Sequence, residues 1–294
     1  MGKTSNDYLS GYILLLPALV LFGAFIVYPL LYGFFISLNQ WDGFGPMKLV
    51  GFSNYAGVFK DELFRISLLH NIEYAVVSVA GKIVLSLFLA TLLNSKIRCL
   101  TFFRAVYFTP VVISFMAIGL MFQLLLDPNV GLVNTLLMKL HVIGEPIMFL
   151  GDEKIALLTI IGVDIWKWVG YQTVVFLAGL QTISGELYES GDIDGASGWQ
   201  KFRFITLPLL KPVTIINVTL CVMGAFSVFD LVFVMTNGSG GPLNSTHVLM
   251  TYMYKITFGG TDSNMGYGST VAYILFAIIL GISIIQSRIA GEEN

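Results

Sequence analysis

Six long apolar stretches constrain this sequence more than any of its other features. A membrane-spanning helix needs about 20 predominantly apolar residues, and each stretch is long enough to form one. Only 12% of the residues are charged, against roughly 25% in soluble domains. We therefore predict an all-α, polytopic membrane protein with six transmembrane helices, at residues 11–38, 70–94, 104–126, 155–180, 212–236 and 266–287.

The first apolar stretch follows Lys3 and has some features of a secretory signal peptide. Its apolar part is about twice as long as the core of a signal peptide, and no small-residue cleavage site follows it. We expect it to be retained as the first helix.

Basic residues favour an orientation with both termini in the cytosol. With the N-terminus inside, the cytosolic segments carry eight Lys or Arg residues, and the longer outer loops carry six. This bias agrees with the positive-inside rule and places residues 182–211, the polar segment, in the cytosol. The inner set is Lys3, Lys96, Arg98, Arg104, Lys201, Arg203, Lys211 and Arg288.

Several function classes are excluded by composition and motifs. A net charge of -2 does not suit an electrostatic nucleic-acid binder, which needs a concentrated basic face. The two cysteines, Cys99 and Cys221, lie too far apart in sequence to suggest a metal site. The sequence Gly81-Lys82-Ile83 lacks the leading glycine and the Ser/Thr of a phosphate-binding loop, so we expect no ATPase activity and no bound cofactor in this chain.

Local signals in the polar segment predict two short helices joined at a glycine. Ser184 is a good N-cap for the first helix, and Gly195 can end it in a left-handed conformation. A second helix is expected to start near Ala196. It should stop before Pro208, because a residue that precedes proline disfavours the helical conformation.

The spacing of residues in the polar segment resembles the EAA loop of ABC-importer permeases. Glu189-Ser190-Gly191 is followed after three residues by Gly195, after nine more by Ile205, and after one more by Leu207-Pro208. In that family the loop is the coupling helix, which sits in a cleft on a cytosolic ATPase. The resemblance implies an ATPase-coupling role for Glu189, Ser190, Gly191, Asp194, Gly195, Ala196, Ile205, Leu207 and Pro208.

One departure from the family pattern affects the stiffness of this loop. The Ala-Ala pair of the family is Ser190-Gly191 here. Glycine lowers helix propensity by about 1 kcal/mol relative to alanine, so the resemblance implies a less rigid first helix with the same role.

The resemblance extends from about residue 11 to residue 290. Within the family, the chain is similar to the carbohydrate-uptake branch, and to its type with a proline-rich first helix. The segments that carry it are 17–41, 126–134, 164–171 and 226–230. It implies one permease domain, 1–294, with the type I importer fold and the coupling loop at 182–211. The implied cargo is a sugar, and an oligosaccharide in particular, with a glycerol phosphate or another polyol-like solute as the alternative.

The same resemblance implies a set of partners in a bacterial cytoplasmic membrane. A second, different permease subunit would complete a heterodimer, and a cytosolic ATPase dimer would bind ATP and Mg²⁺. An extracytoplasmic solute-binding protein would deliver the substrate to the outer loops. Membrane lipids surround the chain, and no nucleic acid is expected.

Two clusters inside the spans combine an aromatic ring with hydrogen-bonding groups. Sugars present C–H faces and hydroxyls, which suit this combination. We therefore predict that these clusters line the translocation pathway, although core packing is the commoner fate of a single aromatic residue. The clusters are Trp166, Gly170 and Tyr171 in the fourth span, and Ser227, Phe229 and Asp230 in the fifth.

Three charged residues lie inside the predicted spans. A charge at the bilayer centre costs about 2.5–3.5 kcal/mol on insertion scales, so it should face protein or water. Asp164 and Lys167 are three residues apart on one helical face and are expected to pair, either as a structural ion pair or within the pathway. One interpretation of Lys82 is that it pairs with a carboxylate of the partner permease.

Two other classes of membrane protein are weighed against the importer. A secondary transporter predicts internal repeats and helices broken at the midplane, and the two halves of this sequence show no clear self-similarity. A membrane-embedded enzyme needs titratable residues clustered at one depth, whereas those in these spans are scattered.

Overall fold

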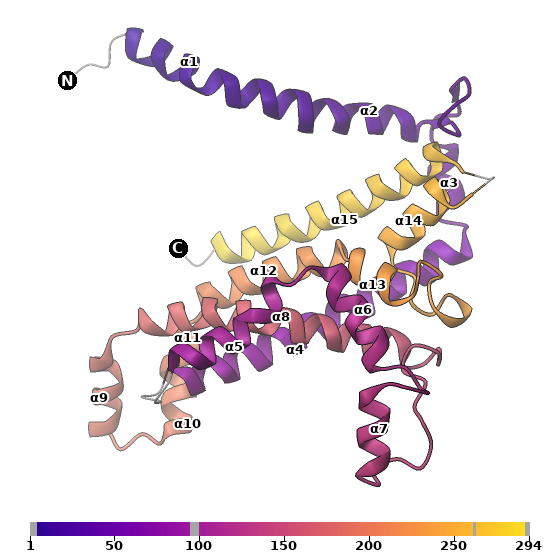
Figure 1. Ribbon diagram of the computed structural model, residues 1–294. Coiled ribbons are helices and arrows are strands. Elements are labelled where there is room, and N and C mark those ends of the chain that lie inside the picture. The colour runs from indigo at the N-terminus through magenta and orange to yellow at the C-terminus, as the bar shows by residue number, and fades with distance from the viewer. Residues whose placement is uncertain (1–4, 95–99, 261–262, 292–294) are drawn as a thin grey trace. The chain divides into compact units, whose positions relative to one another are not determined.

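The computed structural model in Figure 1 is mostly helical and describes residues 5–94, 100–260 and 263–291. Contacts between Cα atoms divide the chain into two compact units. The first unit comprises Met1–Asp61 and Met253–Ile274, and the second comprises Glu62–Tyr252 and Leu275–Asn294. Lys3, Lys96, Arg98 and Cys99, on which parts of the sequence interpretation rest, lie outside the described residues.

The first unit begins with a long apolar helix that contains a single wide turn. Its elements are α1 (Ser5–Phe22), the π-helical turn η1 (Gly23–Val27), α2 (Tyr28–Ser37), β1 (Asn39–Gln40), β2 (Lys48–Leu49) and α3 (Ser53–Val58). Contacts concentrate where α2 ends. The carbonyl of Ser37 accepts hydrogen bonds from Asn54 Nδ2 at 2.9 Å and Thr270 Oγ1 at 3.1 Å. These bonds tie α3 and the start of α15 (Met265–Gly291) to the end of the first helix.

A short hairpin follows this helix, with Asn39 paired to Leu49 in antiparallel register. Its turn is built on Asp42, whose Oδ1 accepts backbone hydrogen bonds from Gly45 at 2.8 Å and Phe44 at 3.0 Å. These bonds stabilise the charged carboxylate and lower the pKa of Asp42 below its usual value.

The second unit holds the helical core. Within it, α4 (Glu62–Leu93) packs against α8 (Ala156–Gln181) and α12 (Lys211–Phe226), and α5 (Leu100–Val112) packs against α8. Two helices, α14 (Leu249–Phe258) and α15 (Met265–Gly291), are divided between the units. The other elements of the second unit are α4 (Glu62–Leu93), α5 (Leu100–Val112), α6 (Phe115–Leu125), α7 (Leu132–Lys139), α8 (Ala156–Gln181), α9 (Gly185–Ile193), α10 (Gly198–Lys201), the π-helical turn η2 (Phe202–Thr206), α11 (Leu207–Leu209), α12 (Lys211–Phe226), α13 (Asp230–Met235) and the 3₁₀ turn η3 (Pro242–Asn244).

Three described helices are long and apolar enough to cross a membrane: Leu14–Ser37, Glu62–Leu93 and Met265–Arg288. Two further helix pairs raise the number to five if each bent pair is one span. α8 is outside this set, since it carries Asp164, Lys167 and other polar residues. A mostly helical chain with several spans agrees with the predicted class, and the count of six stays a prediction.

The structure breaks two of the predicted spans. The span at 104–126 breaks after Val112, where α5 and α6 meet at 98°. The span at 212–236 is interrupted between Phe226 and Asp230. We took broken helices as a mark of secondary transporters, so this feature does not separate the two classes of transporter.

The helix around Pro208 does not stop at the residue before the proline, contrary to our prediction. Leu207 donates its backbone N–H to the carbonyl of Phe202, five residues back, in the wide turn η2. A proline ring clashes with the carbonyl four residues back in a regular α-helix. The wider turn moves that carbonyl aside, and η1 precedes Pro29 in the same way.

Candidate translocation cavity and coupling segment

A cavity of about 510 Å³ opens among α4, α6, α8, α12 and α13 in the second unit. Its wall combines aromatic rings with polar groups. The rings belong to Phe115, Trp168, Tyr171 and Phe229, and the uncharged polar side chains belong to Gln172 and Ser227. Three charged residues, Lys82, Asp164 and Asp230, also line it. We call this space the central cavity.

The spacing of residues along α8 explains which of them reach the central cavity. The cavity residues of α8 are spaced for a single helical face. Counted from Asp164, they follow at four positions (Trp168), seven (Tyr171) and eight (Gln172). The ring of Trp168 packs edge-on against Tyr171, with 5.9 Å between centroids. This face of α8 therefore forms one side of the cavity.

Four of the six predicted pathway residues line the central cavity: Tyr171, Ser227, Phe229 and Asp230. Trp166 does not, because it lies on another face of α8, 40% exposed, with its ring edge-on to Phe122 at 5.2 Å. Transport through this cavity stays a prediction.

Gly170 does not line the cavity either, and its place in the structure is a helix contact. A Cβ atom at this position would overlap the backbone carbonyl of Tyr107 in α5. The absence of a side chain at Gly170 thus lets the backbones of α5 and α8 meet.

Our sequence interpretation did not assign Phe115, Trp168 or Gln172 to the pathway, although all three line the cavity. Helical spacing from Asp164 would have indicated Trp168 and Gln172. Nothing in the sequence indicated Phe115, because its ring reaches the cavity only through the break between α5 and α6.

Lys82 binds a carboxylate of its own chain, which corrects two of our interpretations. Its Nζ lies 2.5 Å from Asp164 Oδ2, and both side chains are 5% exposed. Asp164 therefore pairs with Lys82 of α4 and not with Lys167, and Lys82 needs no carboxylate from a partner permease. Packing of α4 against α8 decides this pairing.

Lys167 has a different set of partners, at the C-terminal end of α5 and just after it. Its Nζ donates hydrogen bonds to the carbonyl oxygens of Pro110 at 3.1 Å, Val111 at 3.2 Å and Ile113 at 2.5 Å. Because an ammonium group has three N–H bonds, these acceptors use all of its donors. The pairing expected with Asp164 is wrong for this reason.

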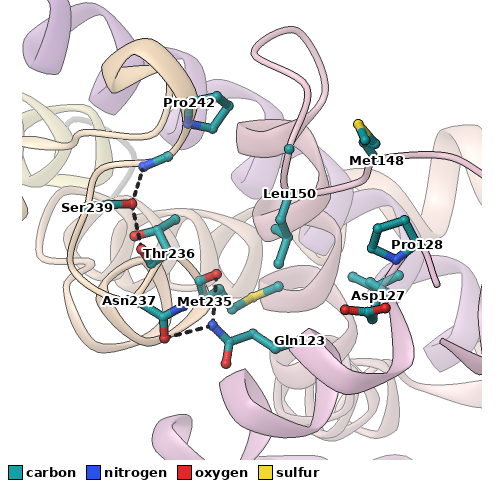
Figure 2. Close-up of a pocket in the computed structure, with 13 residues that line it drawn as sticks. Gln123, Asp127, Pro128, Met148, Leu150, Met235, Thr236, Asn237, Ser239 and Pro242 are labelled. Carbon is teal, nitrogen blue, oxygen red and sulfur yellow. Dashed lines mark hydrogen bonds between the residues drawn. The ribbon is translucent and has the colours of Figure 1, made fainter. Parts of the chain in front are cut away.

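A second and larger hollow of about 630 Å³ lies between the loop after α6 and the loop after α13 (Figure 2). Gln123 ties α6 to the end of α13 and the loop after it, since its Nε2 donates to the carbonyl of Val234 at 2.9 Å and to Asn237 Oδ1 at 3.2 Å. Its lining has polar groups but no aromatic ring. We therefore take the smaller central cavity as the candidate translocation site.

The first half of the polar segment folds as its sequence predicts. Ser184 caps α9, with its hydroxyl accepting the backbone N–H of Glu186 at 3.3 Å. Gly195 follows the helix with a φ of 73°, the left-handed conformation expected of it. Within α9, the hydroxyl of Ser190 donates to the carbonyl of Glu186 at 2.9 Å.

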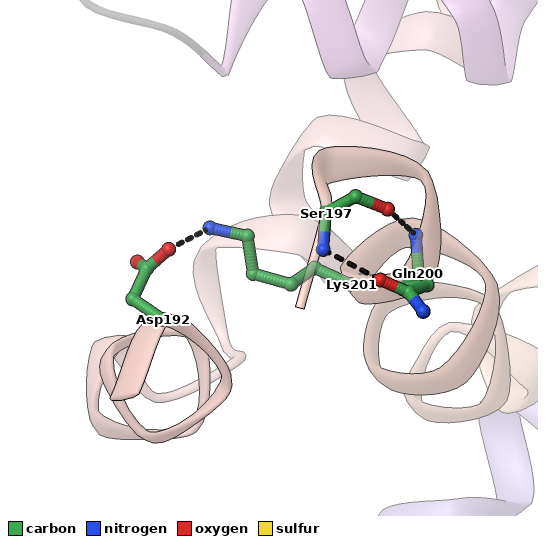
Figure 3. A network of polar contacts seen from close by, with 4 residues as sticks. All are labelled: Asp192, Ser197, Gln200 and Lys201. Atoms are coloured by element: carbon green, nitrogen blue, oxygen red, sulfur yellow. Dashed lines mark hydrogen bonds and ion pairs between the residues drawn. The ribbon is translucent and has the colours of Figure 1, made fainter. Parts of the chain in front are cut away.

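The second half begins slightly later than we expected. Its first helix, α10, starts at Gly198 instead of near Ala196, after a capping box formed by Ser197 and Gln200 (Figure 3). Lys201 reaches back to α9 and pairs with Asp192 at 2.6 Å (Figure 3). This contact joins the two short helices of the polar segment.

Large apolar side chains stand out from the polar segment. Ile193 is 87% exposed, Trp199 71% and Phe204 72%. Exposed apolar side chains mark an interaction surface where they form a contiguous patch. Contact of the nine predicted coupling residues with an ATPase stays a prediction.

Comparison with known families decides the identity of the chain. Residues 82–288 match the family model described as the binding-protein-dependent transport system inner membrane component. The chain belongs to this family. It is therefore a multi-pass permease subunit of the inner membrane and is not itself an ATPase.

The permease is similar to curated relatives over its whole length. It is 38% identical over 288 residues to the probable ABC transporter permease protein YurN of Bacillus subtilis, covering 96% of this chain and 97% of the relative. It is 35% identical to the lactose transport system permease protein LacF of Rhizobium radiobacter, covering 100% of both. It is 32% identical to the arabinooligosaccharides transport system permease protein AraP of Bacillus subtilis, covering 96% of this chain and 88% of the relative.

Solved structures share the fold of the permease. A crystal structure of a bacterial ABC transporter involved in the import of the acidic polysaccharide alginate matches with a TM-score of 0.82 and 21% identity, covering 98% of this chain and 96% of the other. A second structure of an alginate transporter, in complex with a pentasaccharide-bound periplasmic protein, matches with a TM-score of 0.81 and 21% identity, over 97% and 94%.

Proposed function

We propose that the permease carries a sugar, an oligosaccharide in particular, through the central cavity, driven by a separate ATPase. The observation that carries the proposal is the wall of this cavity, where four aromatic rings stand among the polar groups of Gln172, Ser227 and Asp230. Rings stack on the C–H faces of a sugar, and the polar groups bind its hydroxyls. A volume of about 510 Å³ also falls in the range of small-molecule sites.

The names of the relatives support a saccharide over the alternative, a glycerol phosphate or another polyol-like solute. They include transport systems for lactose, for trehalose and maltose, and for arabinooligosaccharides. The charges of the cavity point the same way. The single cation, Lys82, is already paired with Asp164, so no unpaired cation among its lining residues awaits a phosphate.

The polar segment is proposed as the coupling helix that contacts a cytosolic ATPase dimer, which binds ATP and Mg²⁺. Its exposed apolar residues supply an interface core, and its charged residues keep the rest solvated. A second permease subunit and an extracytoplasmic solute-binding protein complete the proposed transporter. ATP binding shifts the population between inward-open and outward-open states through differential binding.

α8 is proposed as the remaining span of a six-helix permease domain, 1–294, with both termini in the cytosol. Its charged residues do not exclude this, because Asp164 is 3% exposed and Lys167 is 2% exposed. A charge inside a membrane protein is tolerated where it is paired and faces protein. The polar stripe of α8 is buried by α4, α5 and α12.

Two tryptophans two residues apart on α8 provide a matched test of the cavity. Trp168 lines the cavity, whereas Trp166 does not. In liposomes that contain the whole transporter and its binding protein, we expect Trp168→Leu to lower saccharide uptake about tenfold, since loss of one stacking ring costs about 1.4 kcal/mol or more. Trp166→Leu should leave uptake near the parent value.

Equal loss in both variants would argue against transport through the central cavity. A panel of labelled saccharides and glycerol phosphate, assayed in the same liposomes, tests the substrate class. Uptake of glycerol phosphate without uptake of any saccharide would establish the alternative cargo.

Gly195 provides the test of coupling. Its positive φ costs an L-residue such as alanine about 1–2 kcal/mol, whereas asparagine tolerates this conformation. We expect Gly195→Ala to lower both the amount of ATPase that co-purifies with the permease and the uptake driven by ATP. Gly195→Asn, the matched control, should retain most of both. ATPase binding unaffected by Gly195→Ala would count against this role for the polar segment.

A further inference from the structure

The break between α5 and α6 places one aromatic ring in the wall of the central cavity. α5 ends at Val112, and Phe115 is the first residue of α6. Ser114 fixes the start of α6, since its hydroxyl accepts the backbone N–H of Ala117 at 3.3 Å. The position of the Phe115 ring therefore depends on where the break falls and on the direction in which α6 leaves it.

Lys167 binds the carbonyl groups that this break leaves without helical partners. The last four carbonyls of an α-helix accept no hydrogen bond from the helix itself, and burying them without a partner is energetically costly. The ammonium of Lys167 donates to three carbonyls at this end of α5, those of Pro110, Val111 and Ile113. Its charge also lies at the negative end of the α5 dipole. Removal of Lys167 would leave this geometry without its main support.

The same ammonium lies against two rings of the cavity wall. It is 4.7 Å from the centroid of Phe115 and 5.6 Å from that of Trp168. Both distances fall within the range of about 6 Å for a cation–π contact. Lys167 does not itself line the cavity. One buried cation thus connects the end of α5 with two rings from α6 and α8.

We propose that Lys167 is a positioning residue for the central cavity. By binding the carbonyls of α5 it fixes the break, and by its contact with the rings it holds Phe115 and Trp168 where a saccharide stacks on them. The inference rests on the proposed function, because it assigns to Lys167 an effect on saccharide affinity. Lys167 differs in this from Lys82, which lines the cavity and pairs with a carboxylate.

The test uses the emission of Trp168 in the whole transporter. The difference between complexes that carry Trp168 and matched complexes with Trp168→Phe isolates this emission. The probe is the disaccharide with the highest uptake in the panel above. We expect Lys167→Met to shift the emission maximum and to raise the half-saturating disaccharide concentration by about fivefold or more. Lys167→Arg should restore most of the affinity, because a guanidinium also donates to carbonyls.

An assembled Lys167→Met complex with unchanged emission and unchanged half-saturation would overturn the proposal. A purely structural role predicts a different result, namely less assembled complex with unaltered affinity per complex. If Trp168→Leu leaves uptake intact, the proposed pathway itself fails. If Trp168→Leu abolishes uptake while Lys167→Met changes neither readout, only the positioning role fails.

A second pair of variants decides the matter if Lys167→Met does not assemble. Phe115 and Phe122 both belong to α6, but only Phe115 lines the cavity. Phe115→Leu should raise the half-saturating concentration about fivefold, and Phe122→Leu should not. Unchanged affinity in Phe115→Leu would overturn the proposal as well.

Discussion

An ion pair lies in the core of the second unit and another lies in the polar segment, and the two are nearly equal in length. Lys82 and Asp164 lie 2.5 Å apart, and Lys201 and Asp192 lie 2.6 Å apart. Their surroundings differ, since the side chains of the first pair are 5% exposed, whereas Asp192 is 64% exposed. Distance alone therefore says little about the energetic importance of either pair. What matters is the state of the remaining charge when its partner is removed.

The largest expected effect follows from breaking the buried pair from one side. Lys82→Met leaves Asp164 as an uncompensated buried charge, and breaking such a pair costs about 3–5 kcal/mol. We expect a large fall in the apparent melting temperature of the purified transporter, and the same for Asp164→Asn. The double variant, Lys82→Met with Asp164→Asn, should be more stable than either single one, because no unpaired charge remains. Additive losses in the double variant would contradict the ion-pair interpretation.

An intermediate effect is expected at a contact in the core that involves no charge. Gly170→Ala places a methyl group against the carbonyl of Tyr107, and overpacking of this kind costs about 1–3 kcal/mol. Gly162, also on α8, is the matched control, because a methyl group added there would extend into open space. Melting temperature should fall for Gly170→Ala and stay or rise for Gly162→Ala. A fall in both would show that glycine matters to α8 for a reason other than the contact with α5.

The smallest effect is expected at the exposed pair. Lys201→Met removes the partner of Asp192, but water solvates the carboxylate that is left, and exposed pairs contribute about 0–1 kcal/mol. The melting temperature should hardly change, and its small shift should shrink further at high salt. A loss as large as that of Lys82→Met would remove the distinction between the two regions.

The two regions also differ in how far the sequence predicted them. In the polar segment, the Ser184 cap and the left-handed Gly195 are confirmed, because both depend on neighbours within a few residues. The end of its second helix was predicted wrongly, since the wide turn before Pro208 relieves a clash that we expected to stop the helix. In the core, four of the predicted pathway residues line the central cavity, whereas Trp166 and Gly170 lie elsewhere on α8.

The sequence by itself determined the helical membrane class, the family resemblance and the local structure of the polar segment. Apolar length, capping residues and motif spacing act along the chain and need no knowledge of distant contacts. Only the tertiary structure decided the partners of the buried charges. Asp164 is closer in sequence to Lys167 than to Lys82, yet it pairs with Lys82 because α4 packs on α8. Lys167 instead donates hydrogen bonds to three backbone carbonyls at the break after α5. A buried charge must be matched by whatever group the fold brings within reach, and that group need not be its neighbour in the chain.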